Sequence, residues 1–82
     1  MDRHEKTLLE ILRGVSDANI AYADLCHLLG WLGFSMRVKG SHHIFRREGV
    51  EERINLQRDG SKAKVYQVRQ VRGVILKYGL GR

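Results

Sequence analysis

Four consecutive residues near the middle of the chain have groups suited to phosphate chemistry: Gly40, Ser41, His42 and His43. Glycine lets a backbone approach a phosphate closely, and a serine hydroxyl can donate a hydrogen bond to one. Imidazole is the side chain best suited to move protons near neutral pH. Such a group could cut RNA without a metal ion, because a neutral histidine can take the proton of a ribose 2′-hydroxyl, whose oxygen then attacks the adjacent phosphorus.

Cationic side chains surround this motif. The 82 residues include 15 Lys and Arg against 9 Asp and Glu, and the formal net charge of +6 suits nucleic acid, an acidic membrane surface or an acidic protein. A basic band that could follow a phosphate backbone comprises Arg46, Arg47, Arg53, Arg58, Lys62 and Lys64. The alternative is a solvated face, because Glu48, Glu51 and Glu52 interrupt the band. Our candidate RNA-binding residues are Lys39, Gly40, Ser41, Arg46, Arg47, Arg58, Lys62 and Lys64.

The hydrophobic pattern predicts the elements that position these residues. Apolar residues recur at helical spacing or alternate with polar ones, and they predict helices at 4–13, 22–32 and 62–77 and strands at 34–39, 42–47 and 51–57. This order predicts an α+β fold in one domain, residues 1–82, because a chain of this length supports a single core. Helices on one face of a three-stranded antiparallel sheet leave its other face open, which is the natural place for a ligand.

The two histidines should point to opposite faces of their strand, as neighbouring strand residues do. If Phe45 belongs to the core, His43 faces inward and His42 lies on the open face; if Ile44 belongs to the core, the roles exchange. We expect substitution of the open-face histidine to abolish activity, and substitution of the inward-facing one mainly to alter folding. The alternative is that both are only polar ends of a strand. Side chains on opposite faces cannot converge on one ion, so we expect no metal site.

The remaining aromatic residues and the lone cysteine are expected in structural roles. We place Tyr22, Trp31, Phe34 and Tyr66 in the core or at its edge, rather than among base-stacking groups. Cys26 lies in an apolar helical stretch, which favours a small buried side chain over a reactive thiol. The helix at 4–13 has a broad apolar stripe, so we expect it to add a layer to the core rather than to serve as a partner surface.

Composition predicts a folded globular protein, because 43% of the residues are apolar and 29% are charged. No segment approaches the run of about 18 apolar residues that a membrane span requires. The amino-terminal residues do not pair a basic start with an apolar stretch, as a signal peptide would. We therefore expect a cytoplasmic protein without a membrane partner.

The segment LLGWLGFSMRVKGSHHIFRR resembles the HicA (YcfA-like) toxins, in which a helix ends in a glycine-aromatic pair and a strand leads to Gly-Ser-His. VRGVILKYGL resembles their closing helix, so the similarity covers roughly residues 22–80. The resemblance implies a fold like a double-stranded-RNA-binding domain, an endoribonuclease that cleaves mRNA without a cofactor, and neutralisation by a HicB-type antitoxin. It carries the catalytic histidine over to His42 first and His43 second, with Gly40 and Ser41 shaping the site.

This chain departs from the family pattern after the third strand. The toxins commonly have a proline and a histidine there, whereas residues 55–60 read NLQRDG and contain neither. A second function class therefore stays open, a non-catalytic RNA-binding module on the same scaffold. A third possibility is a basic protein-interaction domain that does not contact RNA.

Overall fold

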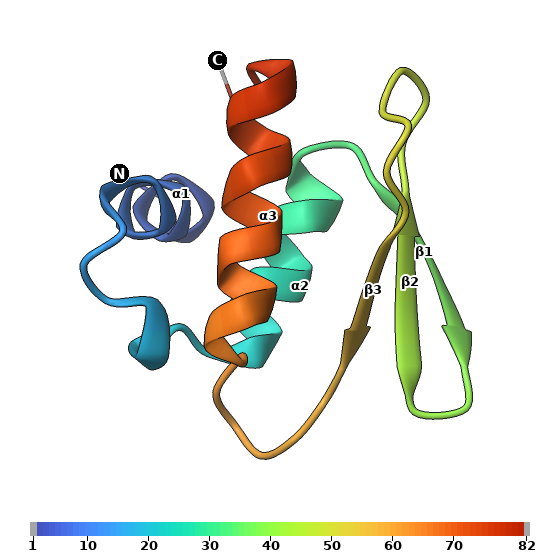
Figure 1. Ribbon diagram of the computed structural model, residues 1–82, viewed down its shortest axis with the longest axis horizontal. Coiled ribbons are helices and arrows are strands. Elements are labelled where there is room, and N and C mark those ends of the chain that lie inside the picture. Colours follow the sequence, from blue (N-terminus) through green and yellow to red (C-terminus); the bar gives the residue numbers. More distant parts are fainter. Residues whose placement is uncertain (1, 82) are drawn as a thin grey trace.

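Two helices, three strands and a closing helix follow one another along the chain (Figure 1). The structure, a computed structural model, describes residues 2–81. Its elements are α1 (Arg3–Arg13), the 3₁₀ helix η1 (Asp17–Asn19), α2 (Tyr22–Trp31), β1 (Ser35–Lys39), β2 (His42–Arg46), β3 (Ile54–Gln57) and α3 (Val65–Tyr78). The predicted α+β class and the order of helices and strands are confirmed, and the segment from α2 to α3 has the helix, three strands and helix that the resemblance implies.

Two elements begin three residues later than their patterns predicted, while the other boundaries differ by at most one residue. The third strand begins at Ile54 rather than at residue 51, because the preceding segment bonds to α3 instead of to β2: the Glu51 amide donates to the Tyr78 hydroxyl. The closing helix begins at Val65 rather than at residue 62, because Lys62 forms a backbone bridge with Ala21.

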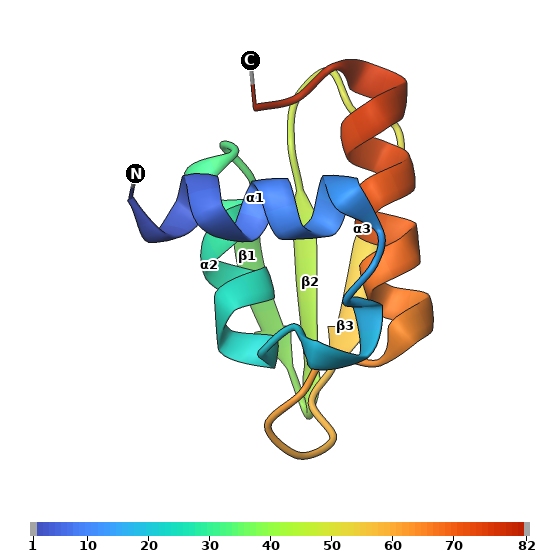
Figure 2. The same cartoon turned by 90° about the vertical axis from the view of Figure 1, so that its left-hand side faces the viewer.

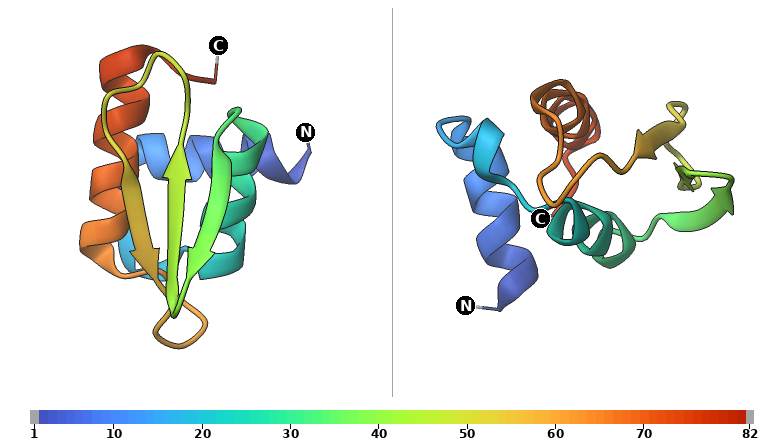
Figure 3. Two further views of the ribbon diagram at one scale, coloured as in Figure 1. Left: turned by 90° about the vertical axis from the view of Figure 1, so that its right-hand side faces the viewer. Right: turned by 90° about the horizontal axis from the view of Figure 1, so that it is seen from below.

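The sheet is antiparallel with the order β1-β2-β3. Gly40 and Ser41 form the two-residue turn between β1 and β2, and Gly40 has a φ of +61°, a left-handed conformation that glycine adopts without strain. Phe45 lies opposite Met36 on β1 and Ile54 on β3. This register turns one side of the sheet toward the helices and leaves the other, which we call the outer face, toward solvent (Figure 3, left).

The helices form two layers on one side of the sheet. Helices α2 and α3 lie between the sheet and α1, which crosses them on the far side (Figures 1 and 2). Leu8 and Ile11 of α1 are buried in the core, so the expectation that this helix adds a core layer is confirmed. The remaining core comes mainly from α2, β2, β3 and α3, with Leu25, Leu28, Leu29, Phe45, Ile54, Leu56, Val68, Val71 and Ile75 nearly or fully buried.

The core contains two of the four aromatic residues expected there. Tyr22 and Phe34 are buried, but Trp31 and Tyr66 are 42% and 65% exposed, so the prediction for these two was wrong. Trp31 lies in the last turn of α2, where it stacks on His4 instead of entering the core. Tyr66 lies on the solvent side of the first turn of α3.

Strand β1 is an edge strand that the helices leave largely uncovered. Met36 and Val38 share the helix-facing side with buried Phe45, yet they are 52% and 57% exposed. The molecule is therefore open along β1 on the side that faces α2. No helix within residues 2–81 is long and apolar enough to cross a membrane.

Candidate functional site

The burial of Phe45 fixes the orientation of both histidines. Phe45 is 1% exposed, so His43, two residues before it on the strand, points toward the helices, and His42 points to the outer face. Of the two registers compatible with the sequence, the structure has the one in which Phe45 is core. His43 is nevertheless only partly buried, because it faces an open pocket and not the sealed core.

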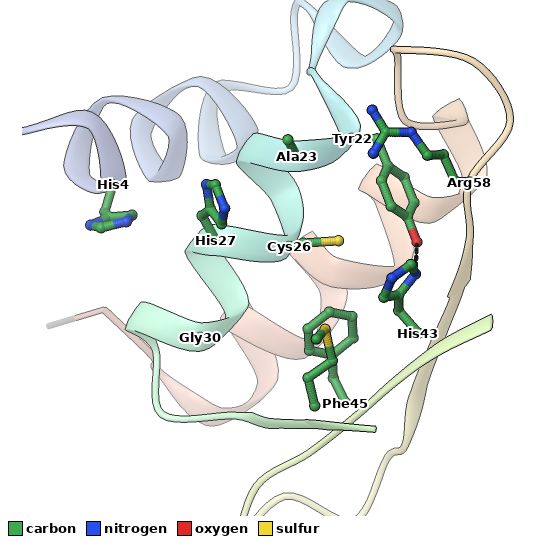
Figure 4. Close-up of a pocket in the computed structure, with 10 residues that line it drawn as sticks. His4, Tyr22, Ala23, Cys26, His27, Gly30, His43, Phe45 and Arg58 are labelled. Atoms are coloured by element: carbon green, nitrogen blue, oxygen red, sulfur yellow. Dashed lines mark hydrogen bonds between the residues drawn. The ribbon is translucent and has the colours of Figure 1, made fainter. Parts of the chain in front are cut away.

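This pocket lies between α2 and the β1–β2 part of the sheet and has a volume of about 470 Å³ (Figure 4). Residues from both walls and from two neighbouring segments line it: His4, Tyr22, Ala23, Cys26, His27, Gly30, Met36, His43, Phe45 and Arg58. Met36 and Phe45 give it an apolar floor, and the polar groups lie around that floor. The size and mixed lining suit one small unit of a ligand, such as a nucleotide, better than a whole duplex.

A hydrogen bond to Tyr22 holds the imidazole of His43. The Tyr22 hydroxyl lies 2.9 Å from Nδ1 of His43, and the two rings meet edge to face with centroids 5.7 Å apart. Burial first and the neighbouring Cys26 thiol second raise the pKa of Tyr22 to about 12, so the phenol keeps its proton at neutral pH. Since no described residue hydrogen-bonds Nε2 of His43, that nitrogen is left for a ligand.

Arg58 brings a cation to the same end of the pocket. Its guanidinium carbon lies 5.5 Å from the centre of the Tyr22 ring, on the segment that leaves β3 (Figure 4). The guanidinium is exposed and makes no ion pair with a carboxylate of residues 2–81. It is therefore available to an anion that enters the pocket beside His43.

Two further features complete the pocket wall. The sequence predicted a small buried side chain at Cys26, but Cys26 is only half-buried beside Tyr22; burial raises the pKa of its thiol, which favours the neutral form over a reactive thiolate. At the other end, His4 stacks on Trp31 with ring centroids 5.6 Å apart. Although the pocket contains several histidines, no three His, Cys, Asp or Glu side chains in the described part of the chain come together as a metal site would require.

His42 lies in a different environment on the outer face. Its Nδ1 is 2.9 Å from the side-chain oxygen of Asn55 on β3. Next to it the Ser41 hydroxyl accepts a hydrogen bond from the Gln57 side chain at 3.1 Å. Both bonds stiffen the β1–β2 turn against β3, so His42 and Ser41 have structural partners on the sheet itself.

The candidate RNA-binding residues do not form one continuous band. Lys39, Gly40, Ser41 and Arg46 lie on the outer face and the turn that borders it, whereas Arg58 lies in the pocket. The remaining three lie apart from both places. Arg47 packs along Gly33, Lys62 is exposed beyond its bridge to Ala21, and Lys64 pairs with Asp59 at 2.7 Å.

The sequence analysis missed the contribution of α2 to the site. It assigned Tyr22 and Cys26 to the core and did not use His27, yet all three line the pocket. A signal was present, because residues 22, 26 and 30 and residues 23 and 27 recur at the four-residue spacing that gathers side chains on one helix face. The spacing does not predict the angle between α2 and the sheet. That angle leaves this face of α2 partly open.

Comparison of the chain with protein-family models, with curated proteins and with solved structures found no match.

Proposed function

We propose that this chain is an endoribonuclease toxin of the HicA kind that cuts mRNA in the pocket between α2 and the sheet, with His43 as the catalytic histidine. One observation carries the proposal: a histidine with Nδ1 bonded to a buried phenol presents its other nitrogen to an open pocket beside a guanidinium. Histidine next to a cation is a combination that serves RNA cleavage through the 2′-hydroxyl.

The reaction begins at the imidazole of His43. With its ring proton on Nδ1 and donated to the Tyr22 oxygen, the neutral imidazole of His43 has a free lone pair on Nε2. Nε2 takes the proton of the ribose 2′-hydroxyl, and the 2′-oxygen attacks the adjacent phosphorus. The bond from phosphorus to the 5′-oxygen breaks, and that oxygen takes a proton from the solvent that the open pocket admits. The products are a 2′,3′-cyclic phosphate and a 5′-hydroxyl.

Arg58 and Tyr22 support this step without exchanging protons with the substrate. The Arg58 guanidinium stabilises the negative charge that develops on the phosphoryl oxygens. Tyr22 is a positioning residue, because its hydroxyl holds the imidazole in one orientation and its raised pKa keeps it from acting as a base. The apolar floor of the pocket can take the base or sugar of the cut nucleotide.

The proposal extends to the partner and the compartment. A HicB-type antitoxin would neutralise the toxin by covering the pocket, whose mouth lies along the exposed edge strand β1. The net charge of +6 suits an acidic partner of this kind. Messenger RNA and such an antitoxin meet the chain in the cytoplasm, and a neighbouring open reading frame for a small acidic protein is the simplest sign of the pair.

Induced expression in bacteria tests the proposal. We expect the wild-type chain and His42→Ala to arrest growth and deplete mRNA, and His43→Ala to do neither, because only His43 reaches the pocket. This reverses the expectation from the sequence, which gave the catalytic role to the open-face histidine. Circular dichroism of the purified variants checks that each is folded. If the wild-type chain leaves growth and mRNA intact while the purified protein binds RNA, the enzyme is ruled out and the non-catalytic RNA-binding module takes its place.

A further inference from the structure

The outer face of the sheet carries four cations that the pocket does not use. Arg37 and Lys39 extend from β1, Arg46 from β2 and Arg53 from the residue just before β3. All four are exposed. The other side chains on this face are uncharged or imidazole, namely Ser35, His42, Ile44, Asn55 and Gln57. No carboxylate lies among them, so every Lys, Arg, Asp or Glu side chain on the face that points away from the helices is cationic.

Folding alone does not account for this arrangement. Arg37 and Arg46 are diagonal neighbours on adjacent strands of one sheet face, and like charges at such short range repel each other. Elsewhere in residues 2–81 several cations have acidic partners: Arg72 pairs with Asp17 at 2.8 Å and Lys77 with Glu52 at 2.9 Å. None of the four outer cations pairs with a described carboxylate. Their charge is therefore free for an external anion.

The four cations also converge. They line one hollow of about 420 Å³ on the outer face together with Ser35, Met36 and Ile44. A second hollow shares Lys39, Ile44 and Arg53 with the first and adds Gly40, His42 and Asn55. Cations that line the same hollows lie close enough together to contact successive phosphates of one chain. Cations that point in different directions are not.

We infer that the outer sheet face binds the phosphate backbone of RNA, as a second surface separate from the pocket. The inference rests on the proposed function only for the choice of RNA as the polyanion. His42 is the only ring among the residues of this face, so the surface lacks the aromatic groups on which bases stack. It therefore holds RNA through phosphates without base selection. Because β1 is an edge strand, an RNA strand can pass around it from the outer face to His43.

Binding of an RNA that cannot be cleaved tests this inference apart from catalysis. The probe is a fluorescent oligoribonucleotide with 2′-O-methyl groups throughout, titrated between about 50 and 200 mM salt. For the Arg37→Gln/Arg46→Gln double variant we expect affinity to fall on the order of tenfold at 0.1 M salt, and the slope of log affinity against log salt to decrease by about 1.4. The matched control, Lys6→Gln/Arg13→Gln, removes the same charge from α1 on the far side of the helical layers and keeps the wild-type slope.

Other outcomes distinguish a failure of the proposed catalysis from a failure of the outer-face inference. If the wild type cuts no RNA but the outer-face variant still loses binding relative to the α1 control, the proposed catalysis fails while the outer surface stands. Equal losses in the outer-face variant and the α1 control would overturn the inference. Tighter binding of polyglutamate than of the RNA probe, dependent on Arg37 and Arg46, would identify an acidic protein as the ligand and overturn it as well.

Discussion

Two adjacent histidines of one strand have separate surroundings, and this separation decides which of them can act. His43 shares a pocket with a protonated phenol and a free guanidinium, whereas His42 bonds to Asn55 among the outer cations. A histidine that acts as a base needs one nitrogen fixed and the other exposed to substrate. Both imidazoles have Nδ1 in a hydrogen bond, to the Tyr22 hydroxyl for His43 and to Asn55 for His42, but only His43 faces the pocket with an apolar floor between α2 and the sheet.

Replacing that hydroxyl therefore tests the positioning role. For Tyr22→Phe we expect kcat to fall on the order of tenfold, a part of what a positioned base contributes, with a smaller change in KM. The lost hydrogen bond should lower the free energy of unfolding by roughly 1 kcal/mol. The measurement is the steady-state cleavage of a short RNA together with thermal unfolding.

Tyr66→Phe is the matched control, because it removes the same hydroxyl from an exposed site on α3. It should leave kcat and the melting temperature unchanged. A Tyr22→Phe variant that loses stability but keeps the wild-type kcat would reduce Tyr22 to a structural residue.

At the scale of elements, the periodicity of the sequence predicts the three α-helices and the three strands, because each has an apolar stripe or face, although that of β1 stays largely exposed. It misplaces the start of β3 and of α3, where long-range backbone contacts override the local pattern: the Glu51 amide donates to the Tyr78 hydroxyl, and Lys62 forms a bridge with Ala21 through the hydrogen bonds of their neighbours. The turn at Gly40 and the opposite directions of the histidines follow from local rules and were predicted. The pocket was not predicted, because it depends on the distance between β1 and α2, and no local sequence pattern determines that distance.

The Glu52 carboxylate attaches the loop before β3 to α3, and this carboxylate titrates in acid. Lys77 first and the Tyr78 hydroxyl second lower the pKa of Glu52 to about 2 from its ordinary value of 4.5. A lowered pKa means that the charged carboxylate stabilises the fold above pH 4.5 and that this stability is lost as the pH falls toward about 2. We therefore expect the melting temperature to drop across that interval, and to drop less in Glu52→Gln.

Thermal unfolding followed by circular dichroism across this pH interval measures the difference. Part of the drop should persist in Glu52→Gln, because Arg72 also holds the pKa of the Asp17 carboxyl below its usual range. Glu48→Gln is the control, since Glu48 lies in the same loop and makes no ion pair with a described residue. Identical pH dependence in Glu52→Gln and the wild type would show that this contact contributes nothing to stability.

The whole molecule is a layered wedge, with α1 on α2 and α3, and a sheet that is covered on the β3 side and open on the β1 side (Figures 1 and 3). The open side contains the pocket with His43, and the reverse of the same strands carries the outer cations. Arg58 at the pocket and the four outer cations make no ion pair with a described carboxylate, so both faces of the sheet offer free positive charge. Under the proposed function, this arrangement divides holding the RNA from cutting it between two faces of one sheet.

The most direct test of the central claim is the chemical nature of the cut ends. Purified protein is incubated with a short RNA in excess EDTA, and the products are identified by mass spectrometry. We predict fragments that end in a 2′,3′-cyclic phosphate and begin with a 5′-hydroxyl, absent with His43→Ala and absent at a position where the RNA carries 2′-deoxyribose. Fragments with 5′-phosphates, or equal cleavage by His43→Ala, would contradict the account.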